Sequence, residues 1–440
     1  MENIQQTTSI LIRKEQRTLQ NSNLTPKKIE SIVKETIIGQ DEGVRAVATA
    51  VAAHLLRVEH NKNFPDEQIQ KSNLLVIGNS GCGKTETIKT IIRELDLDIP
   101  IAVIDASSLT TSGYKGKNVE DILIDLAKDA TNIFNQKFRK NYKGASQEEY
   151  DQQAKKVILS LCNKGIIILD EIDKMRIDPQ KNYDDNMFQR GCQQQLLKII
   201  EGATGIGDGV NTSKIDTTDI LFICAGAHLG LEEITRQRLT TGKYKVQEEK
   251  PQIGFILSNE KNSQNEEIKK NDAKNFTDEE LLPTSEDLIE YGYIPELVGR
   301  IPMRCRYKPI TAKILYRILK ESKASPAEQA RLMISDTYND LHFTDGALRA
   351  IAVKAAKENT GVRGLKTIIE KITGNIYYEF AGNPDHLITI TMDTVLKKTA
   401  PEVTDYPDVP KIPASEGKLT ALNENWEEDL LNLASIKIKP

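Results

Sequence analysis

The sequence predicts an α/β protein, in which a domain with a largely parallel five-stranded sheet precedes a smaller, mainly helical domain. Short apolar runs bounded by turn residues alternate with amphipathic helical patterns, and a helical pattern follows them. Strands that alternate with helices are typical of a parallel sheet, because each parallel connection needs a crossover. The five predicted strands are Leu74–Ile77, Ile101–Ile104, Ile166–Leu169, Ile220–Cys224 and Met303–Tyr307.

Helices are predicted on both sides of these strands. Thr25 precedes Pro26, which is the pattern of an N-cap followed by proline at the first helical position. A second helix is expected from Asp41 to about His60, because its apolar residues recur with a helical period. The later helices are expected at Ile314–Leu319, Ala327–Tyr338, Asp345–Lys357 and Gly364–Phe380, followed by a strand at Leu387–Thr391.

These patterns divide the chain into four segments. Residues 1–23 are polar and expected to be a flexible lead-in. We expect the α/β domain at 24–310, the small helical domain at 311–396 and a loosely packed tail at 397–440. Inside the first domain, residues 242–287 are rich in Lys, Glu, Asn and Gln and are predicted to form a mobile loop.

The composition narrows the classes of function. The net charge of −5 gives no overall basic field to attract nucleic acid. No apolar run reaches the ~18 residues of a membrane helix, and the N-terminus lacks a signal-peptide pattern, so we expect a cytoplasmic protein. The five cysteines are isolated from one another, which indicates reduced thiols and no zinc site.

A nucleotide-binding motif follows the first predicted strand and precedes a helix. Glycines in such a loop let successive backbone N–H groups surround phosphates, at a helix N-terminus that favours negative charge. Lys84 is expected to reach the β and γ phosphates, and the Thr85 hydroxyl to bind Mg²⁺. The motif consists of Gly78, Asn79, Ser80, Gly81, Cys82, Gly83, Lys84 and Thr85.

A second motif ends the strand Ile166–Leu169, where Asp170 and Glu171 follow four apolar residues. Ligands of open α/β sheets bind at the carboxyl ends of the strands. We therefore predict that Asp170 holds Mg²⁺ and that Glu171 orients and polarises the attacking water. We interpret the two motifs as the Walker A and Walker B elements of an ATPase and expect ATP and Mg²⁺ as cofactors.

Two arginines are candidates for stabilising charge on the γ-phosphate. Arg300 lies just before the last predicted strand, and Arg363 opens a helix of the small domain. A guanidinium suits this role because its planar N–H groups match phosphate oxygens. From the residues alone, each arginine is explained better by a surface salt bridge.

Taken together, these segments resemble the AAA+ proteins of the ClpX group, which are ring-shaped bacterial protein unfoldases. The resemblance covers about Leu24 to Thr391. It also includes Ile38-Gly39-Gln40, Gly113–Gly116, Asp170–Lys174, Gln194–Gly202, Leu221–Cys224, Ile294–Arg300 and Arg363-Gly364-Leu365.

The resemblance implies a fold and residue roles. It implies an AAA+ large domain with a small helical lid, and a homo-hexamer. Ile37, Ile38 and Gly39 would line the adenine pocket. Arg300 would be the arginine finger for a neighbouring subunit, and Arg363 the sensor that closes on ATP in its own subunit.

The resemblance also implies two loops that act on proteins. Gly113, Tyr114, Lys115 and Gly116 match the family's pore loop, in which an aromatic flanked by glycines grips a threaded chain. Ile253, Gly254 and Phe255 stand where ClpX proteins carry the loop that docks on the ClpP peptidase. The rival interpretation is that the tripeptide is a small hydrophobic anchor that ties the loop to its own domain.

The sequence departs from the family in several places. We expect no N-terminal zinc-binding domain, because no cysteine precedes Cys82, and the basic pore-entrance loop is absent between Gly202 and Asp219. The length of the segment Phe134–Leu161 and the run Gly116–Ala130 resemble HslU, a close relative that serves a different peptidase. The leading interpretation is an ATP-driven unfoldase that feeds a ClpP-type peptidase. A stand-alone remodelling chaperone, an HslU-like ATPase and a nucleic-acid motor stay open as alternatives.

Overall fold

The structure is a computed structural model that describes residues 25–95, 97–110, 117–118, 121–139, 147–178, 182, 186–203, 215–241, 276–337, 339–358 and 360–405. These residues form two compact units. The sheet unit contains the described residues within 49–78 and 97–306. The P-loop unit contains those within 1–48, 79–96 and 307–440, so segments distant in sequence belong to the same unit.

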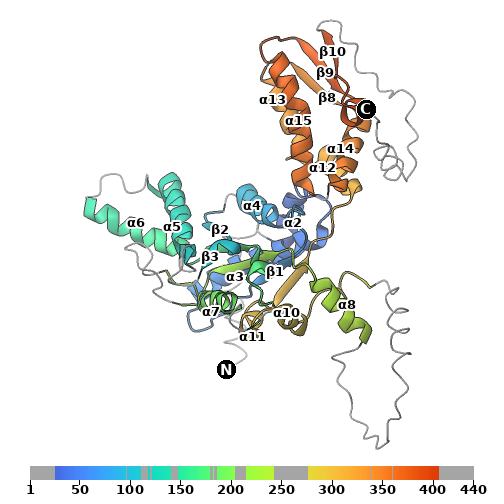
Figure 1. The fold of residues 1–440 in the computed structure, drawn as a ribbon. Helices are drawn as coiled ribbons and strands as arrows, with labels where there is room; N and C mark the ends of the chain where they lie inside the picture. Colours follow the sequence, from blue (N-terminus) through green and yellow to red (C-terminus); the bar gives the residue numbers. More distant parts are fainter. Residues whose placement is uncertain are drawn as a thin grey trace, which may run out of the picture. The chain divides into compact units, whose positions relative to one another are not determined.

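The sheet unit is built on a five-stranded sheet in the order β2-β5-β6-β1-β7, with every pair parallel (Figure 1). This confirms the predicted α/β class. β1 and β6 are buried along their whole length, which explains their continuous apolar sequences. The strands are β1 (Leu74–Ile77), β2 (Ile101–Asp105), β5 (Ile166–Asp170), β6 (Leu221–Gly226) and β7 (Met303–Arg306).

Helices connect the strands of this unit and bury their apolar faces against it. Ile122 and Leu126 of α5 and Leu196 and Ile200 of α7 belong to its hydrophobic core. α5 and α6 pack against each other as a hairpin (Figure 1). The helices are α5 (Asp121–Ile133), η2 (Phe134–Phe138), α6 (Gln147–Cys162), η4 (Ile172–Met175), α7 (Met187–Glu201), α8 (Leu231–Thr241), α10 (Ser285–Tyr291) and α11 (Pro295–Gly299). Short elements after β2 are η1 (Ala106–Ser108) and the parallel pair β3 (Leu109–Thr110) and β4 (Lys117–Asn118).

The P-loop unit combines N-terminal helices with the C-terminal part of the chain. Thr25 caps α2 as predicted, and its side chain accepts a hydrogen bond from Lys28 N–H. The C-terminal core contains Leu315, Ile351 and Leu365, and Ile38 packs against it. The helices are α2 (Pro26–Lys34), α4 (Lys84–Leu95), α12 (Ala312–Glu321), α13 (Pro326–Ser335), α14 (Asp345–Lys357), α15 (Val362–Phe380) and α16 (Met392–Lys397), with α3 (Asp41–Asn63) shared between the units.

The C-terminal part contains more strand than the sequence predicted. A three-stranded sheet has the order β10-β9-β8, from β8 (Asp340–Phe343), β9 (His386–Ile390) and β10 (Glu402–Asp405). β10 falls in the segment predicted to be tail. Its four residues are largely exposed and it pairs through its backbone with β9, so no apolar pattern announces it.

The predicted loop at 242–287 overlaps a helix at its C-terminal end. α10 begins at Ser285, where Thr284 and Asp287 form a capping box. The Asp287 carboxylate is buried and accepts from Arg238 of α8. Residues 242–275 lie outside the described residues.

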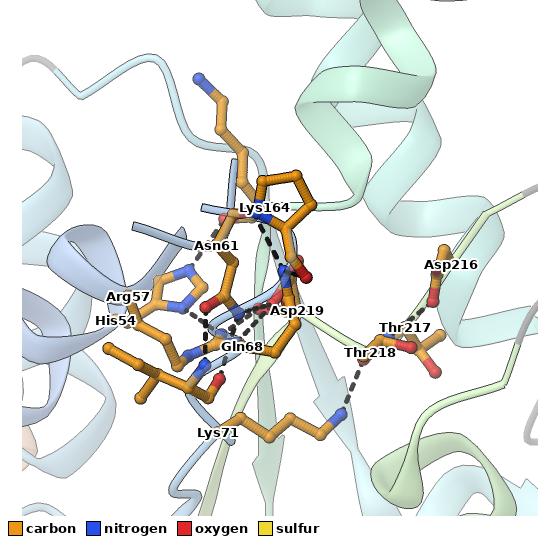
Figure 2. A network of polar contacts seen from close by, with 12 residues as sticks. His54, Arg57, Asn61, Gln68, Lys71, Lys164, Asp216, Thr217, Thr218 and Asp219 are labelled. Carbon is orange, nitrogen blue, oxygen red and sulfur yellow. Dashed lines mark hydrogen bonds and ion pairs between the residues drawn. The ribbon is translucent and has the colours of Figure 1, made fainter. Parts of the chain in front are cut away.

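A buried polar network lies at the edge of the sheet where the strands begin (Figure 2). Arg57 of α3 pairs with Asp219, which also accepts from Asn61 at 3.1 Å. His54 Nε2 donates to the carbonyl oxygen of Lys164 at 2.9 Å, and burial lowers the pKa of His54 to about 4. Lys164 and Asp219 stand shortly before β5 and β6, so the network fixes the starts of two central strands.

None of the described helices is both long and apolar enough to cross a membrane.

Candidate nucleotide site

The loop after β1 has the backbone that phosphate binding requires. Gly81 and Gly83 have φ values of 76° and 99°, a region that glycine adopts without strain. α4 starts at Lys84, so the loop ends at a helix N-terminus. The Lys84 side chain is 8% exposed, and its Nζ donates to the carbonyl oxygen of Asn79 at 2.9 Å. The residues present therefore fit a phosphate group, which Lys84 would bind in exchange for that carbonyl.

The start of α15 packs directly on this loop within the P-loop unit. The Val362 N–H donates to the carbonyl oxygen of Gly81 at 3.2 Å. Arg363 Nη1 lies 3.5 Å from the hydroxyl of Ser80, a residue 283 positions earlier. The structure thus brings the predicted sensor arginine to the Walker A loop of its own chain.

Substituting Gly361 tests how closely the loop and α15 must approach. Gly361 has φ 60° and ψ −144°, and an added Cβ would lie 2.7 Å from the Gly81 carbonyl oxygen. We expect Gly361→Ala to strain this contact by roughly 1–3 kcal/mol and to weaken ATP binding measurably by titration with a fluorescent ATP analogue.

Gly374→Ala is the matched control, since Gly374 lies inside α15, the helix that Gly361 precedes as N-cap, and an added Cβ there meets nothing within 4 Å. This variant should bind ATP normally and be slightly more stable to heat, because alanine favours a helix by about 1 kcal/mol over glycine. Equal ATP affinity in both variants would contradict the packing argument.

The residues predicted to line the adenine pocket also lie in the P-loop unit. Ile37 is nearly buried, and its Cγ2 is 4.0 Å from where a Cβ on Gly83 would stand. Gly39 has φ 78° and lies against Ile314 of α12. Gln40 anchors this segment, because its side chain exchanges two 2.9 Å hydrogen bonds with the backbone of Lys308.

The Walker B carboxylates lie where predicted, at the carboxyl end of β5. Asp170 is the last residue of the strand, and its Oδ1 accepts the Glu171 N–H at 3.0 Å. Glu171 is exposed and has a left-handed backbone, with φ 55° and ψ 34°. This conformation is uncommon for a residue other than glycine, and such strain concentrates at functional positions.

The sequence did not single out two residues at the same edge of the sheet. Asp173 Oδ1 accepts the N–H of Ala227, just after β6, at 3.2 Å. His228 has φ 51°, is 3% exposed and lies 2.9 Å through Nε2 from the Tyr293 hydroxyl. Burial holds the pKa of Tyr293 well above its usual value, so the hydroxyl keeps its proton. The sequence could have pointed to this region only through position. β6 lies between β5 and β1 in the sheet, so residues just after β6 lie near the ends of the strands that precede the two motifs.

Arg300 lies at the opposite edge of the sheet, where the strands begin. The buried Asn73 side chain donates through Nδ2 to the Arg300 carbonyl oxygen at 2.8 Å, and its Oδ1 accepts the Phe222 N–H at 3.0 Å. β1 alone has four residues, about 13 Å at 3.3 Å per residue, and it separates this edge from the one at which Asp170 and Glu171 lie. The structure therefore does not bring Arg300 together with Asp170 and Glu171 of the same chain.

Two predicted loops lie outside the described residues. They are the pore loop Gly113, Tyr114, Lys115 and Gly116, and the docking tripeptide Ile253, Gly254 and Phe255. Their roles stay predictions.

Comparisons with known proteins agree with this geometry. A family model described as an AAA domain of the Cdc48 subfamily matches residues 69–304, which is more than half of the chain. A protein of Treponema denticola named ATP-dependent Clp protease ATP-binding subunit ClpX is 35% identical over 364 residues, covering 81% of this chain and 77% of its own. Proteins of the same name from Borrelia duttonii and Borrelia recurrentis are each 32% identical over 383 residues, covering 84% of this chain and 78% of their own. The chain is therefore an ATPase of the AAA family and belongs to its ClpX group.

Proposed function

We propose that this protein is an ATP-driven unfoldase whose subunits form a ring and share their active sites, and that it feeds polypeptides to a ClpP-type peptidase. The observation that carries this proposal is the position of Arg300. It lies at the edge of the sheet opposite the Walker B carboxylates. A site that includes this guanidinium needs a second copy of the chain.

The arrangement of donor and acceptor surfaces favours a closed ring. If Arg300 of one copy approaches the nucleotide of the next, each copy uses two different surfaces. Contacts of this head-to-tail kind generate rings when the rotation closes. The hexameric state is taken from the resemblance to ClpX proteins.

Within one subunit, the residues divide the chemistry of ATP hydrolysis. Lys84 and the loop N–H groups bind the phosphates, and Arg363 approaches from α15. Glu171 orients and polarises the attacking water. Thr85 and Asp170 are the residues that would hold Mg²⁺, which when bound neutralises phosphate charge. Ile37 and Ile38 would contact the base.

The action on proteins rests on the two predicted loops and on the relatives. The relatives' name describes a subunit of a Clp protease. Tyr114 would grip the substrate chain, and Ile253 and Phe255 would fill apolar pockets on the peptidase. The acidic net charge of −5 argues against nucleic acid as the substrate. We propose a cytoplasmic location for this activity.

A paired experiment separates gripping from docking. Tyr114→Ala should retain basal ATPase activity and lose unfolding of a fluorescent protein that carries a long unstructured tail, because the apolar grip is gone. Deletion of Ile253–Phe255 should retain unfolding and lose stimulation of a purified ClpP-type peptidase. The decrease in substrate fluorescence measures unfolding, and the rate of peptide cleavage measures stimulation of the peptidase.

Each variant is the control for the other, because each changes a predicted loop and is expected to leave the function of the other loop intact. Unfolding that survives Tyr114→Ala would disprove the pore role. Wild-type protein that unfolds the substrate yet never stimulates the peptidase would favour the stand-alone remodelling chaperone.

A further inference from the structure

The guanidinium of Arg300 is held by one carboxylate of its own chain. Arg300 Nε donates to Glu201 Oε1 at 3.0 Å, and Nη2 lies 2.8 Å from the same oxygen. A guanidinium has five N–H groups, arranged along two edges that can each bind an oxyanion. Glu201 engages the Nε–Nη2 edge. The N–H groups of the Nη1–Nη2 edge that these contacts do not use suit a phosphate oxygen.

The backbone that carries each partner is fixed separately. On the arginine side, the Asn73 amide holds the Arg300 carbonyl oxygen, and Asn73 is only 2% exposed. Asn73 also accepts the Met303 N–H through its own carbonyl oxygen at 3.3 Å, which aligns β7 with β1. Arg300 therefore starts from a rigid point at the beginning of β7.

On the glutamate side, Glu201 is the last residue of α7, and the turn after it is closed by Thr217. The Ala203 N–H donates to Thr217 Oγ1 at 2.9 Å, and this hydroxyl donates to the Ile199 carbonyl oxygen at 2.8 Å. Lys71 Nζ donates to the Thr217 carbonyl oxygen at 2.7 Å (Figure 2). Thr217 is fully buried, so the end of α7 is fixed as firmly as the start of β7.

The ion pair itself is too exposed to matter much for stability. The side chains of Arg300 and Glu201 are 55% and 39% exposed. Exposed pairs contribute only about 0–1 kcal/mol to folding. Two rigid backbones that bring a weak, solvent-facing pair together indicate a role in orientation, because the contact limits the rotamers of a long side chain.

We propose that Glu201 is a positioning residue for Arg300. It holds the guanidinium so that the Nη1–Nη2 edge faces the nucleotide of the neighbouring subunit. This inference rests on the proposed role of Arg300 in a shared active site. The carboxylate does not touch substrate. Its effect is on the geometry of the group that does, and small misplacements of such groups can slow catalysis by up to about 100-fold.

The test compares Glu201→Ala and Glu201→Gln with wild-type protein in the assembled ring, with assembly checked by sedimentation. We expect kcat for ATP hydrolysis to fall by about tenfold in Glu201→Ala, while affinity for a fluorescent ATP analogue and the melting temperature stay unchanged. Glu201→Gln should lose less activity, because its amide oxygen still accepts from Nε. Glu321→Gln is the matched control, since Glu321 forms an exposed pair with Arg317 on α12, and it should be fully active.

A double-mutant cycle makes the result specific. Glu201→Ala should cause no further loss in an Arg300→Ala background, because both changes act on one interaction. Full turnover by Arg300→Ala would instead refute the proposed shared site. If Arg300→Ala is slow while both Glu201 variants turn over normally, only the positioning role fails. A faster Glu201→Ala enzyme would also overturn it, since the pair would then restrain Arg300 rather than present it.

Discussion

Replacing Glu171 with glutamine is expected to leave ATP binding intact and to lower ATP turnover by at least about 100-fold, the usual contribution of a general base. Glutamine has the shape of glutamate and can keep the left-handed backbone at this position. It lacks the charge that withdraws a proton from the attacking water. Phosphate release in the steady state and titration with a fluorescent ATP analogue measure the two effects.

A second glutamate-to-glutamine substitution controls for the general effect of removing a carboxylate. Glu370→Gln changes an exposed carboxylate on α15 that pairs with Lys366, so it should hydrolyse ATP at the wild-type rate. A Glu171→Gln enzyme that turns over normally would remove Glu171 from the water-activating role. The inactive, ATP-bound ring should also retain protein substrates, and mass spectrometry of what it captures would identify them.

The sequence predicted the centre of the sheet well because the central strands are buried. β1 and β6 contact the core on both faces, so every residue carries the apolar signal. β10 shows the opposite case, since backbone pairing holds an exposed strand whose side chains carry no pattern. The Walker motifs were predictable because each is a local run of residues whose spacing the chemistry fixes.

Contacts between distant residues were harder to predict. The family resemblance implied that Arg363 closes on ATP in its own subunit, but nothing in the sequence pointed to Ser80 as the residue it approaches. Asn73 belongs to none of the segments that carry the family resemblance, and Glu201 belongs to one only as part of Gln194–Gly202, with no role of its own. Their importance appears only when the starts of β1 and β7 and the end of α7 meet at one edge. The left-handed His228 was missed for the same reason.

Arg300→Ala should lower kcat by roughly 1,000-fold, the lower range for loss of an arginine finger, while ATP binding persists. Binding should persist because Arg300 lies at the edge of the sheet opposite the Walker B carboxylates of its own chain. Arg317→Ala, which removes an exposed arginine of α12, is the control and should remain active.

Mixing two inactive variants decides whether the arginine acts on its own subunit or on a neighbour. Arg300→Ala subunits keep Glu171, and Glu171→Gln subunits keep Arg300. In a ring of shared sites, an Arg300→Ala subunit can be completed by a Glu171→Gln neighbour, and about one interface in four is complete in a random equal mixture. Activity should therefore appear on mixing and rise with the time allowed for subunit exchange. If Arg300 acted only within its own chain, no mixed ring would contain a working site, and the mixture would stay as inactive as its components.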